Sequence, residues 1–397
     1  MVTPIGISGD DEIVYGHARA EAAKLVGLDR VPVVRLSHLT PEERRAYLIA
    51  DNQLALNAGW NRELLAAELK ELEALDFELP ALGFSLAEID TLFDEAAEAR
   101  IDAQDEPEDD IPALPDEAVT RPGDIWLLGN HRLLCGDSRD PASYADLLGD
   151  EQVDLIFTDP PYNVEIDGNV CGSGNIRHRE FAMAAGEMSE EQFTGFLVET
   201  LGQAAKVCRD GAIAFVCMDW RHMGELTAAG KVVFTELKNV CVWNKRNAGM
   251  GTFYRSKHEM IFVFKIGMAP HINTFGLGDK GRYRTNVWDY AGISSAGAAR
   301  LEELAMHPTV KPVALIADAL KDCSKRGDIV FDNFGGSGST LIAAQKTGRQ
   351  ARLIEFDPLY CDVIIRRFEK FTGQQARLAS GGTFETISTS RLRLLVT

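Results

Sequence analysis

Residues 328–340 read DIVFDNFGGSGST, a strand-like run followed by a glycine-rich turn and the start of a helix. The pattern predicts a strand over 328–332 and a helix over 339–347. Glycines in such a turn let a ligand approach the backbone and the helix N-terminus. The next predicted strand, 352–355, ends in Glu355, whose carboxylate is placed to accept hydrogen bonds from ribose hydroxyls. By itself this pattern fits NAD, FAD, S-adenosylmethionine or a turn that binds nothing.

Short apolar runs alternate with helical stretches through the rest of the chain from about residue 121. Further strands are predicted at 153–158, 212–217, 240–243 and 260–264. Further helices are predicted at 189–207 and 312–323. This alternation predicts a doubly wound α/β fold with a mostly parallel sheet, in which ligands bind at the carboxyl ends of the strands.

The predicted strand 153–158 runs directly into the tetrapeptide Asp159-Pro160-Pro161-Tyr162. Because proline lacks an N–H and restricts φ, the Pro160 carbonyl and the Asp159 carboxylate form a rigid pair of acceptors. Two acceptors directed at one amino group take both of its protons in hydrogen bonds, which frees the nitrogen lone pair for attack. Tyr162 offers a flat face on which a base can stack. The alternative is a strand-ending turn with a capping aspartate.

Charge is distributed unevenly along the 397 residues. The net charge of −19 argues against a nucleic-acid partner. However, residues 85–120 contain thirteen acids against Arg100 alone, whereas residues 221–284 contain eleven cations against four acids. A basic island of this kind is what a phosphate-binding surface would look like, and the alternative is a solvated face that binds nothing.

The N-terminal quarter is predicted as a small α-rich module with one short strand at 31–36. Residues 40–43 and 85–88 carry helix-start signals, the second of them a capping box. The acidic, proline-containing stretch that follows predicts an extended, self-repelling linker. The predicted parts are the module (1–95), the linker (96–120), the α/β domain (121–380) and a tail without a predicted element (381–397).

Cysteine usage indicates neither a metal site nor a disulfide framework. The seven cysteines are scattered, and no two of them form a Cys-x-x-Cys pair. No apolar run approaches the roughly 20 residues that span a bilayer. The N-terminus has no basic, signal-like start. We therefore expect a cytoplasmic protein without a bound metal and without a membrane partner.

Together, these motifs resemble the β-class amino-methyltransferases of DNA, in which the catalytic tetrapeptide precedes the glycine-rich motif. The resemblance covers about residues 121–373. It implies S-adenosylmethionine as cofactor, double-stranded DNA as partner, and direct methyl transfer to the exocyclic amine of a flipped base. The N6 amine of adenine is favoured over the N4 amine of cytosine, because the adenine enzymes usually carry Asp first and the cytosine enzymes Ser.

The resemblance also assigns roles to individual residues. The catalytic residues are Asp159, Pro160, Pro161 and Tyr162. The cofactor-binding residues are Asp137, Thr309, Lys311, Asp332, Phe334, Gly336, Ser337, Gly338 and Glu355. The target-recognition region is expected at about 221–290, with Lys245, Arg246, Arg255 and Lys257 on the DNA. One departure is Asn333, where the family usually has proline; asparagine tolerates unusual φ and ψ.

Residues 13–23 and 31–33 resemble the ParB-like nuclease/partition fold, and the resemblance implies a module shortened at its N-terminus. One alternative is therefore a DNA-binding regulatory protein whose methyltransferase domain is inactive. A nicotinamide oxidoreductase is a second alternative, but it leaves the Pro-Pro-Tyr run unexplained. The recognition sequence, a restriction partner and formation of a homodimer stay open at this point.

Overall fold

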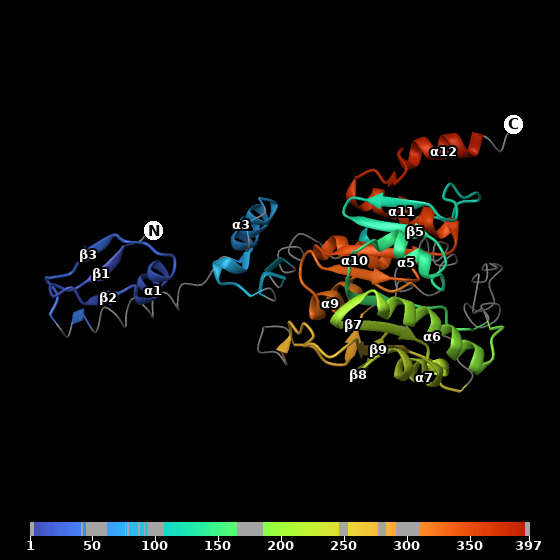
Figure 1. Cartoon of the computed structure of the whole chain (residues 1–397), viewed down its shortest axis with the longest axis horizontal. Helices are drawn as coiled ribbons and strands as arrows, with labels where there is room; N and C mark the ends of the chain where they lie inside the picture. Colours follow the sequence, from blue (N-terminus) through green and yellow to red (C-terminus); the bar gives the residue numbers. More distant parts are fainter. Residues whose placement is uncertain are drawn as a thin grey trace. The chain divides into compact units, whose positions relative to one another are not determined.

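The computed structural model describes residues 4–40, 43–44, 62–75, 77, 79–85, 88–90, 92–93, 107–164, 186–245, 253–276, 283–290 and 310–393. The chain divides into two compact units, Met1–Ala74 and Leu75–Thr397 (Figure 1). Within the described ranges, no helix is both long enough and apolar enough to cross a membrane.

The N-terminal unit contains a three-stranded sheet in the order β2-β1-β3. The predicted strand at 31–36 is confirmed as β3, whereas β1 and β2 were not predicted, so this unit mixes strands with helices. Gly16, with φ 88°, precedes α1, and the Arg19 guanidinium donates to the Pro4 carbonyl at 3.1 Å. The elements are β1 (Ile5–Ile7), β2 (Ile13–Tyr15), α1 (His17–Leu25), β3 (Val33–Arg35) and α3 (Arg62–Ala74).

The second unit is built on one ten-stranded sheet in the order β10-β8-β9-β7-β6-β11-β12-β5-β4-β13. The five strands from β7 to β5 in this order are parallel, and antiparallel pairs flank them on both sides. The predicted doubly wound α/β fold is confirmed. The strands are β4 (Ile125–Leu128), β5 (His131–Cys135), β6 (Val153–Thr158), β7 (Cys208–Met218), β8 (Glu236–Asn244), β9 (His258–Lys265), β10 (Val287–Asp289), β11 (Ile329–Asp332), β12 (Gln350–Glu355) and β13 (Arg377–Leu378).

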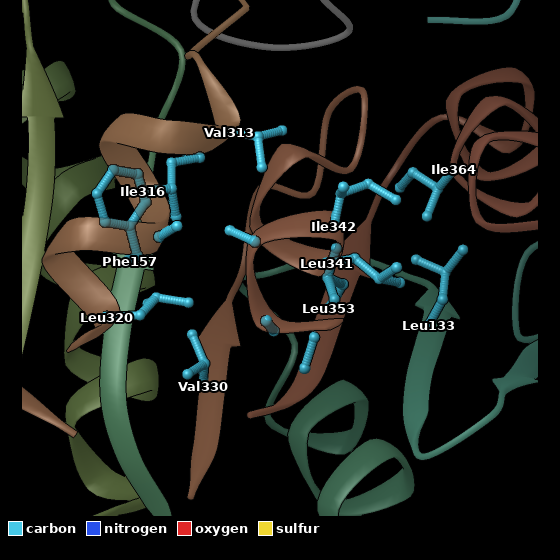
Figure 2. Close-up of a cluster of buried hydrophobic side chains, with 14 of the residues drawn as sticks. Leu133, Phe157, Val313, Ile316, Leu320, Val330, Leu341, Ile342, Leu353 and Ile364 are labelled. Atoms are coloured by element: carbon cyan, nitrogen blue, oxygen red, sulfur yellow. The ribbon is translucent and has the colours of Figure 1, made fainter. Parts of the chain in front are cut away.

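Helices cover both faces of this sheet because its central strands are apolar on both sides. Along β6, Leu155 and Phe157 belong to one buried cluster and Ile156 to the other, as strand alternation requires. Figure 2 shows the first cluster, in which Phe157 lies near helix residue Ile316. On that side lie α9 (Val313–Cys323), α10 (Ser339–Thr347) and α11 (Pro358–Thr372); on the other lie α5 (Pro141–Leu148), α6 (Glu190–Lys206) and α7 (Met223–Val233).

Residues 108–110, here called the acidic segment, pack against the helices of the second unit. This corrects the prediction of an extended linker over 96–120; residues 96–106 lie outside the described residues. The charges do not repel one another into solvent, because cations and a helix end from later in the sequence lie beside them. Glu108 pairs with Lys346 of α10, Asp109 accepts from the Val313 N–H at the start of α9 (2.9 Å), and Asp110 pairs with Lys370 of α11.

The C-terminal tail, for which no element was predicted, contains α12 (Phe384–Arg393). Phe384 is buried and meets Trp126 of β4 edge to face, with ring centroids 5.4 Å apart. Arg391 donates to the Val119 carbonyl at 2.9 Å and pairs with Asp124. The tail therefore packs against β4 and the residues just before it.

Candidate active site

The two sequence motifs meet where the winding of the sheet changes direction. β6 and β11 are parallel neighbours. The chain leaves β6 through α6 towards β7 on one side and leaves β11 through α10 towards β12 on the other. Open α/β sheets bind ligands outside the carboxyl ends of the strands at this point. Asp159 follows β6 and Asp332 ends β11, so both carboxylates lie at the expected edge.

A buried hydrogen bond joins the two strand ends. Thr158 Oγ1 donates to Asn333 Oδ1 at 2.8 Å. Among the described residues, the non-glycine residues with positive φ are Asp11 and Asn163. Asn333 therefore does not have the positive φ that asparagine tolerates better than most residues. Its side chain instead supplies an acceptor for Thr158, which the proline usual at this position lacks.

The Asp159 carboxylate is held by two donors. Tyr162 Oη donates to Asp159 Oδ1 at 2.5 Å, and Lys311 Nζ donates to Asp159 Oδ2 at 2.6 Å. A carboxylate offers about four acceptor positions, so two remain for a substrate. The preceding strand and the two prolines fix the backbone on which these acceptors are placed.

Lys311 contacts the tetrapeptide 159–162, although it lies 152 positions from Asp159 in the sequence. Its side chain is 3% exposed, and its ammonium lies 2.9 Å from Glu259 Oε2 and 3.0 Å from Tyr162 Oη in addition to Asp159. The resemblance places Lys311 among the cofactor-binding residues, and that role stays a prediction. The structure places the Lys311 ammonium beside Asp159, because residues 310–312 bring the start of α9 to the carboxyl end of β6.

Glu259 was not assigned a role from the sequence, where it is one polar residue at the start of an apolar strand. In the structure its side chain is 11% exposed and binds two ammonium groups, those of Lys311 and Lys245. β9 runs antiparallel to β7, so Glu259 near its N-terminus reaches the same edge as Asp159. The local sequence 257–259 contains no signal for this pairing.

Burial and charge shift the pKa values of this cluster in opposite directions. Burial raises the pKa of Asp159, although the positive charge of Lys311 opposes the rise. Burial would also raise the pKa of Glu259, but Lys311 and Lys245 lower it to about 2. Burial would lower the pKa of Lys311, but Asp159 and Glu259 raise it well above its usual value. Lys311 and Glu259 are therefore charged at neutral pH.

The glycine-rich turn is shaped for a ligand at its outer side. Gly336 has φ 51°, and an added Cβ there would meet nothing closer than the Phe334 carbonyl oxygen at 3.9 Å. The Gly336 N–H donates to Glu355 Oε2 at 2.7 Å, which fixes the carboxylate at the end of β12. The space above Gly336 and the N-terminus of α10 thus fit a polar cofactor.

Two carboxylates lie beside the glycine-rich turn: Asp332, which is buried, and Glu355, which is partly exposed. Thr340 Oγ1 donates to Asp332 Oδ2 at 2.6 Å, and the Phe334 N–H donates to Asp332 Oδ1 at 3.1 Å. Burial raises the pKa of Asp332 to about 7 and that of Glu355 to about 7. Both side chains have acceptor positions left for the hydroxyl or amino groups of a ligand.

The other predicted cofactor residues are distributed unevenly around this turn. Asp137, just after β5, is held by Arg139 at 2.6 Å, and this hydrogen bond lowers its pKa. Ser337 accepts from buried Arg367 through its carbonyl (3.0 Å) and its hydroxyl (3.3 Å), so its polar groups are turned towards the protein. Gly338, with φ 82°, packs on Ile364. Thr309 lies outside the described residues.

The predicted DNA-binding residues divide into two groups. Lys245 directs its ammonium to Glu259 and is 27% exposed, whereas Arg255 and Lys257 are exposed in the connection between β8 and β9. That connection leaves from and returns to the carboxyl edge of the sheet. It also carries Phe253 and Tyr254, which are 88% and 81% exposed. Arg246 lies outside the described residues.

Residues 153–366 match a protein family described as DNA methylase, and residues 63–122 match one described as ParB-methyltransferase HTH domain. The second match starts inside the predicted N-terminal module and extends through the predicted linker.

Two curated proteins and one solved structure illustrate the similarity. The type II methyltransferase M2.MboI of Moraxella bovis is 24% identical over 232 residues, which cover 56% of this chain and 83% of that protein. The DNA adenine methyltransferase YhdJ of Escherichia coli strain K12 is 25% identical over 244 residues, covering 55% and 77%. A crystal structure of the M1.HpyAVI–SAM complex aligns with a TM-score of 0.44 and 18% identity, covering 59% of this chain and 97% of that one.

Proposed function

We propose, from the premise that the chain belongs to the DNA methylase family and uses S-adenosylmethionine, that it methylates the N6 amine of adenine in double-stranded DNA. The observation that carries this proposal is the position of Asp159 and Pro160 at the end of β6, beside the glycine-rich turn that follows β11. One edge of the sheet thus contains both an acceptor pair for an amine and a turn that fits the cofactor.

The chain's own groups prepare the amine for attack. Asp159 and the Pro160 carbonyl accept one hydrogen bond each from the two N–H groups, so that the lone pair is no longer drawn into the base. When bound, S-adenosylmethionine would supply a methyl group activated by its positively charged sulfur; the amine would form a bond to the methyl carbon as the carbon–sulfur bond breaks, with S-adenosylhomocysteine as the leaving group. The Asp159 carboxylate then takes the proton that the methylated nitrogen loses and passes it to water. Positioning and electrostatics supply most of the rate enhancement in such a site.

The ring of Tyr162 is held in place for a flipped base. Its hydroxyl is fixed by Asp159 and Lys311, and the Lys311 ammonium lies 5.3 Å from the ring centroid on one face. We assign the opposite face to stacking on the target base, an interaction that contributes about 1–3 kcal/mol per base. Tyr162 would then hold the base by stacking while Asp159 and the Pro160 carbonyl bind its amine.

Adenine is proposed over cytosine on two grounds. Asp159 opens the tetrapeptide, as is usual in the adenine enzymes of the resembling class. The relative YhdJ, 25% identical over 244 residues, is named a DNA adenine methyltransferase.

We place the DNA on the carboxyl edge of the sheet, around the connection between β8 and β9. Arg255 and Lys257 supply positive charge for phosphates, and exposed Phe253 and Tyr254 supply apolar surface for bases. Lys245 is left out of this surface because its ammonium pairs with Glu259. The predicted cytoplasmic location remains part of the proposal, since it follows from the DNA substrate.

Mass spectrometry of nucleosides tests the assignment of the base. DNA lacking methylated bases is incubated with the protein and S-adenosylmethionine and then digested to nucleosides. We expect N6-methyladenosine (deoxy form) as the product. Detection of N4-methylcytosine would instead assign the activity to the N4 amine of cytosine. The absence of any methylated base would favour the alternative of a DNA-binding protein with an inactive methyltransferase domain.

A further inference from the structure

We propose that two positioning residues act on Asp159, the acceptor of the target amine: Lys311 keeps it ionised and oriented, and Glu259 holds Lys311 in place while opposing the ionisation of Asp159. This inference rests on the proposed function of Asp159. It gives Lys311 a role other than the cofactor contact implied by the sequence resemblance, and it assigns a role to Glu259, which had none.

The Lys311 ammonium is matched to three acceptors. It lies 2.6 Å from Asp159 Oδ2, 2.9 Å from Glu259 Oε2 and 3.0 Å from Tyr162 Oη. An ammonium has three N–H donors and no acceptor, so one donor can be directed at each oxygen. Since the side chain is only 3% exposed, water contributes little to its solvation, and the two carboxylates provide the balancing charge.

Charges alternate along the cluster in the order Asp159, Lys311, Glu259, Lys245. Two negative and two positive groups make the cluster neutral, which is the condition under which buried charges are tolerated. Lys245 closes the series at the more exposed end, where 27% of its side chain is accessible. Glu259 is therefore shared by two cations, and Lys311 by two anions.

Three further titratable groups face Asp159. Tyr162 donates to it, and Cys217 of β7 and Asp332 of β11 contribute weaker electrostatic interactions. Burial raises the pKa of Tyr162 and of Cys217 well above their ordinary values, so both are neutral. Burial raises the pKa of Asp159, and beyond burial its charge is controlled by the attraction of Lys311 and the repulsion of Glu259.

Lys311 and Glu259 should act on Asp159 in opposite directions. Without Lys311, Asp159 would lie in a partly buried site near a second carboxylate. It would bind a proton more readily, because burial and like charge both favour the neutral form. A protonated Asp159 has lost an acceptor position. Without the Glu259 charge, Asp159 would be the one carboxylate paired with the Lys311 ammonium and would no longer be repelled by Glu259. Asp159 would then stay ionised to lower pH.

The test compares the full-length wild type with Glu259→Gln, Lys311→Gln and the control Glu236→Gln. Glu236 is exposed at the opposite end of β8 and pairs with Lys238, so the control removes a glutamate charge from the same sheet. Single-turnover methylation of DNA is measured against pH at saturating S-adenosylmethionine. The acidic limb should move to lower pH by at least about half a unit in Glu259→Gln and to higher pH by about one unit in Lys311→Gln. In Glu236→Gln it should not move.

Two further measurements test the variants without relying on methylation activity, and the first of them also shows whether each variant is folded. Calorimetry of S-adenosylmethionine binding should give dissociation constants within about threefold of wild type for all three variants. Carbon-13 NMR of aspartate-labelled protein, assigned with Asp159→Asn, titrates the Asp159 carboxyl directly and should show the same opposite shifts.

Shifts in the same direction, or none, would overturn the inference. So would a Lys311→Gln variant that loses cofactor binding while the Asp159 titration is unchanged, because that result describes a cofactor ligand. If the wild type methylates no base, the proposed function fails, and the NMR titration still decides between the two outcomes for Lys311 and Glu259.

Discussion

The Asp109 carboxylate accepts a hydrogen bond from the Val313 N–H at 2.9 Å, although the two residues are 204 positions apart. Val313 begins α9, and Pro312 before it makes no side-chain capping bond. The acidic segment thus caps a helix of the methyltransferase domain and places a negative charge at its N-terminus. Because Lys311 precedes Val313 by two residues, this cap also fixes the backbone that carries Lys311.

Loss of this cap should destabilise the protein. In Asp109→Ala the buried Val313 N–H would lose its acceptor, at a cost of about 2 kcal/mol in the free energy of unfolding. The matched control is Asp110→Ala, which breaks the pair with Lys370 and weakens the attraction of the acidic segment for Arg367, as Asp109→Ala also does. The Lys370 side chain is 63% exposed, so the loss should be about 0.5 kcal/mol. Urea denaturation measures both, and equal losses would contradict the capping role.

Stability without cofactor should depend on pH through Asp332. Its pKa is raised by burial to about 7, above the value near 4 of an unfolded aspartate. The folded state therefore holds a proton that the unfolded state releases between these values. The resulting stability is fully present below about pH 4 and is lost as pH rises through about 7, at up to about 1.4 kcal/mol per unit.

Asp332→Asn removes this titration, so the free energy of unfolding should fall less between pH 5 and pH 8 than in the wild type. Glu355, whose pKa burial also raises to about 7, keeps part of the slope. Asp150→Asn, which changes an exposed aspartate, serves as the control and should keep the wild-type slope. An Asp332→Asn profile parallel to that of wild type would show that this carboxyl is not protonated in the folded state.

Two glycines of the same turn should fail in different ways when replaced by alanine. Both have positive φ, so each replacement costs about 1–2 kcal/mol in backbone strain. A Cβ at Gly338 would lie 3.1 Å from Ile364, whereas at Gly336 it would point into space that we assign to the cofactor. Gly338→Ala should therefore lose more stability, and Gly336→Ala more cofactor affinity. Thermal melting and calorimetry distinguish them; the reverse order would contradict the placement of the cofactor.

Lys257→Glu should weaken DNA binding and reduce its dependence on salt. A lost phosphate contact lowers the slope of log affinity against log salt by about one. Lys238→Glu is the control, because Lys238 lies near the opposite end of β8. Fluorescence anisotropy at several salt concentrations gives both slopes. Equal effects of the two substitutions would place the DNA elsewhere.

Local signals in the sequence predicted the framework of the site. The helix after the glycine-rich turn begins at Ser339 and ends at Thr347 as predicted, and the strand before Asp159 has its predicted bounds. In both places the apolar pattern, the glycines and the prolines act on their immediate neighbours. The glycine-rich turn and the tetrapeptide could therefore be located from the local sequence, without knowledge of contacts between distant residues.

Contacts between distant residues were not predictable in this way. Lys311 and Asp159 are 152 positions apart, and the packing of α9 against β6 brings them together. The acidic segment was assigned to a linker because its own composition is repulsive, but its partners Lys346 and Lys370 follow more than 230 residues later. Composition describes a segment alone, whereas burial of its charges depends on what the fold places against it.

The most direct test of the central claim is tritium transfer from labelled S-adenosylmethionine to DNA by Asp159→Ala, together with calorimetry of cofactor binding. We expect the transfer rate to fall by roughly 10³-fold, because one of the two acceptors for the amine is lost. The dissociation constant of S-adenosylmethionine should stay within about threefold of wild type. A variant that transfers tritium at the wild-type rate would contradict the account.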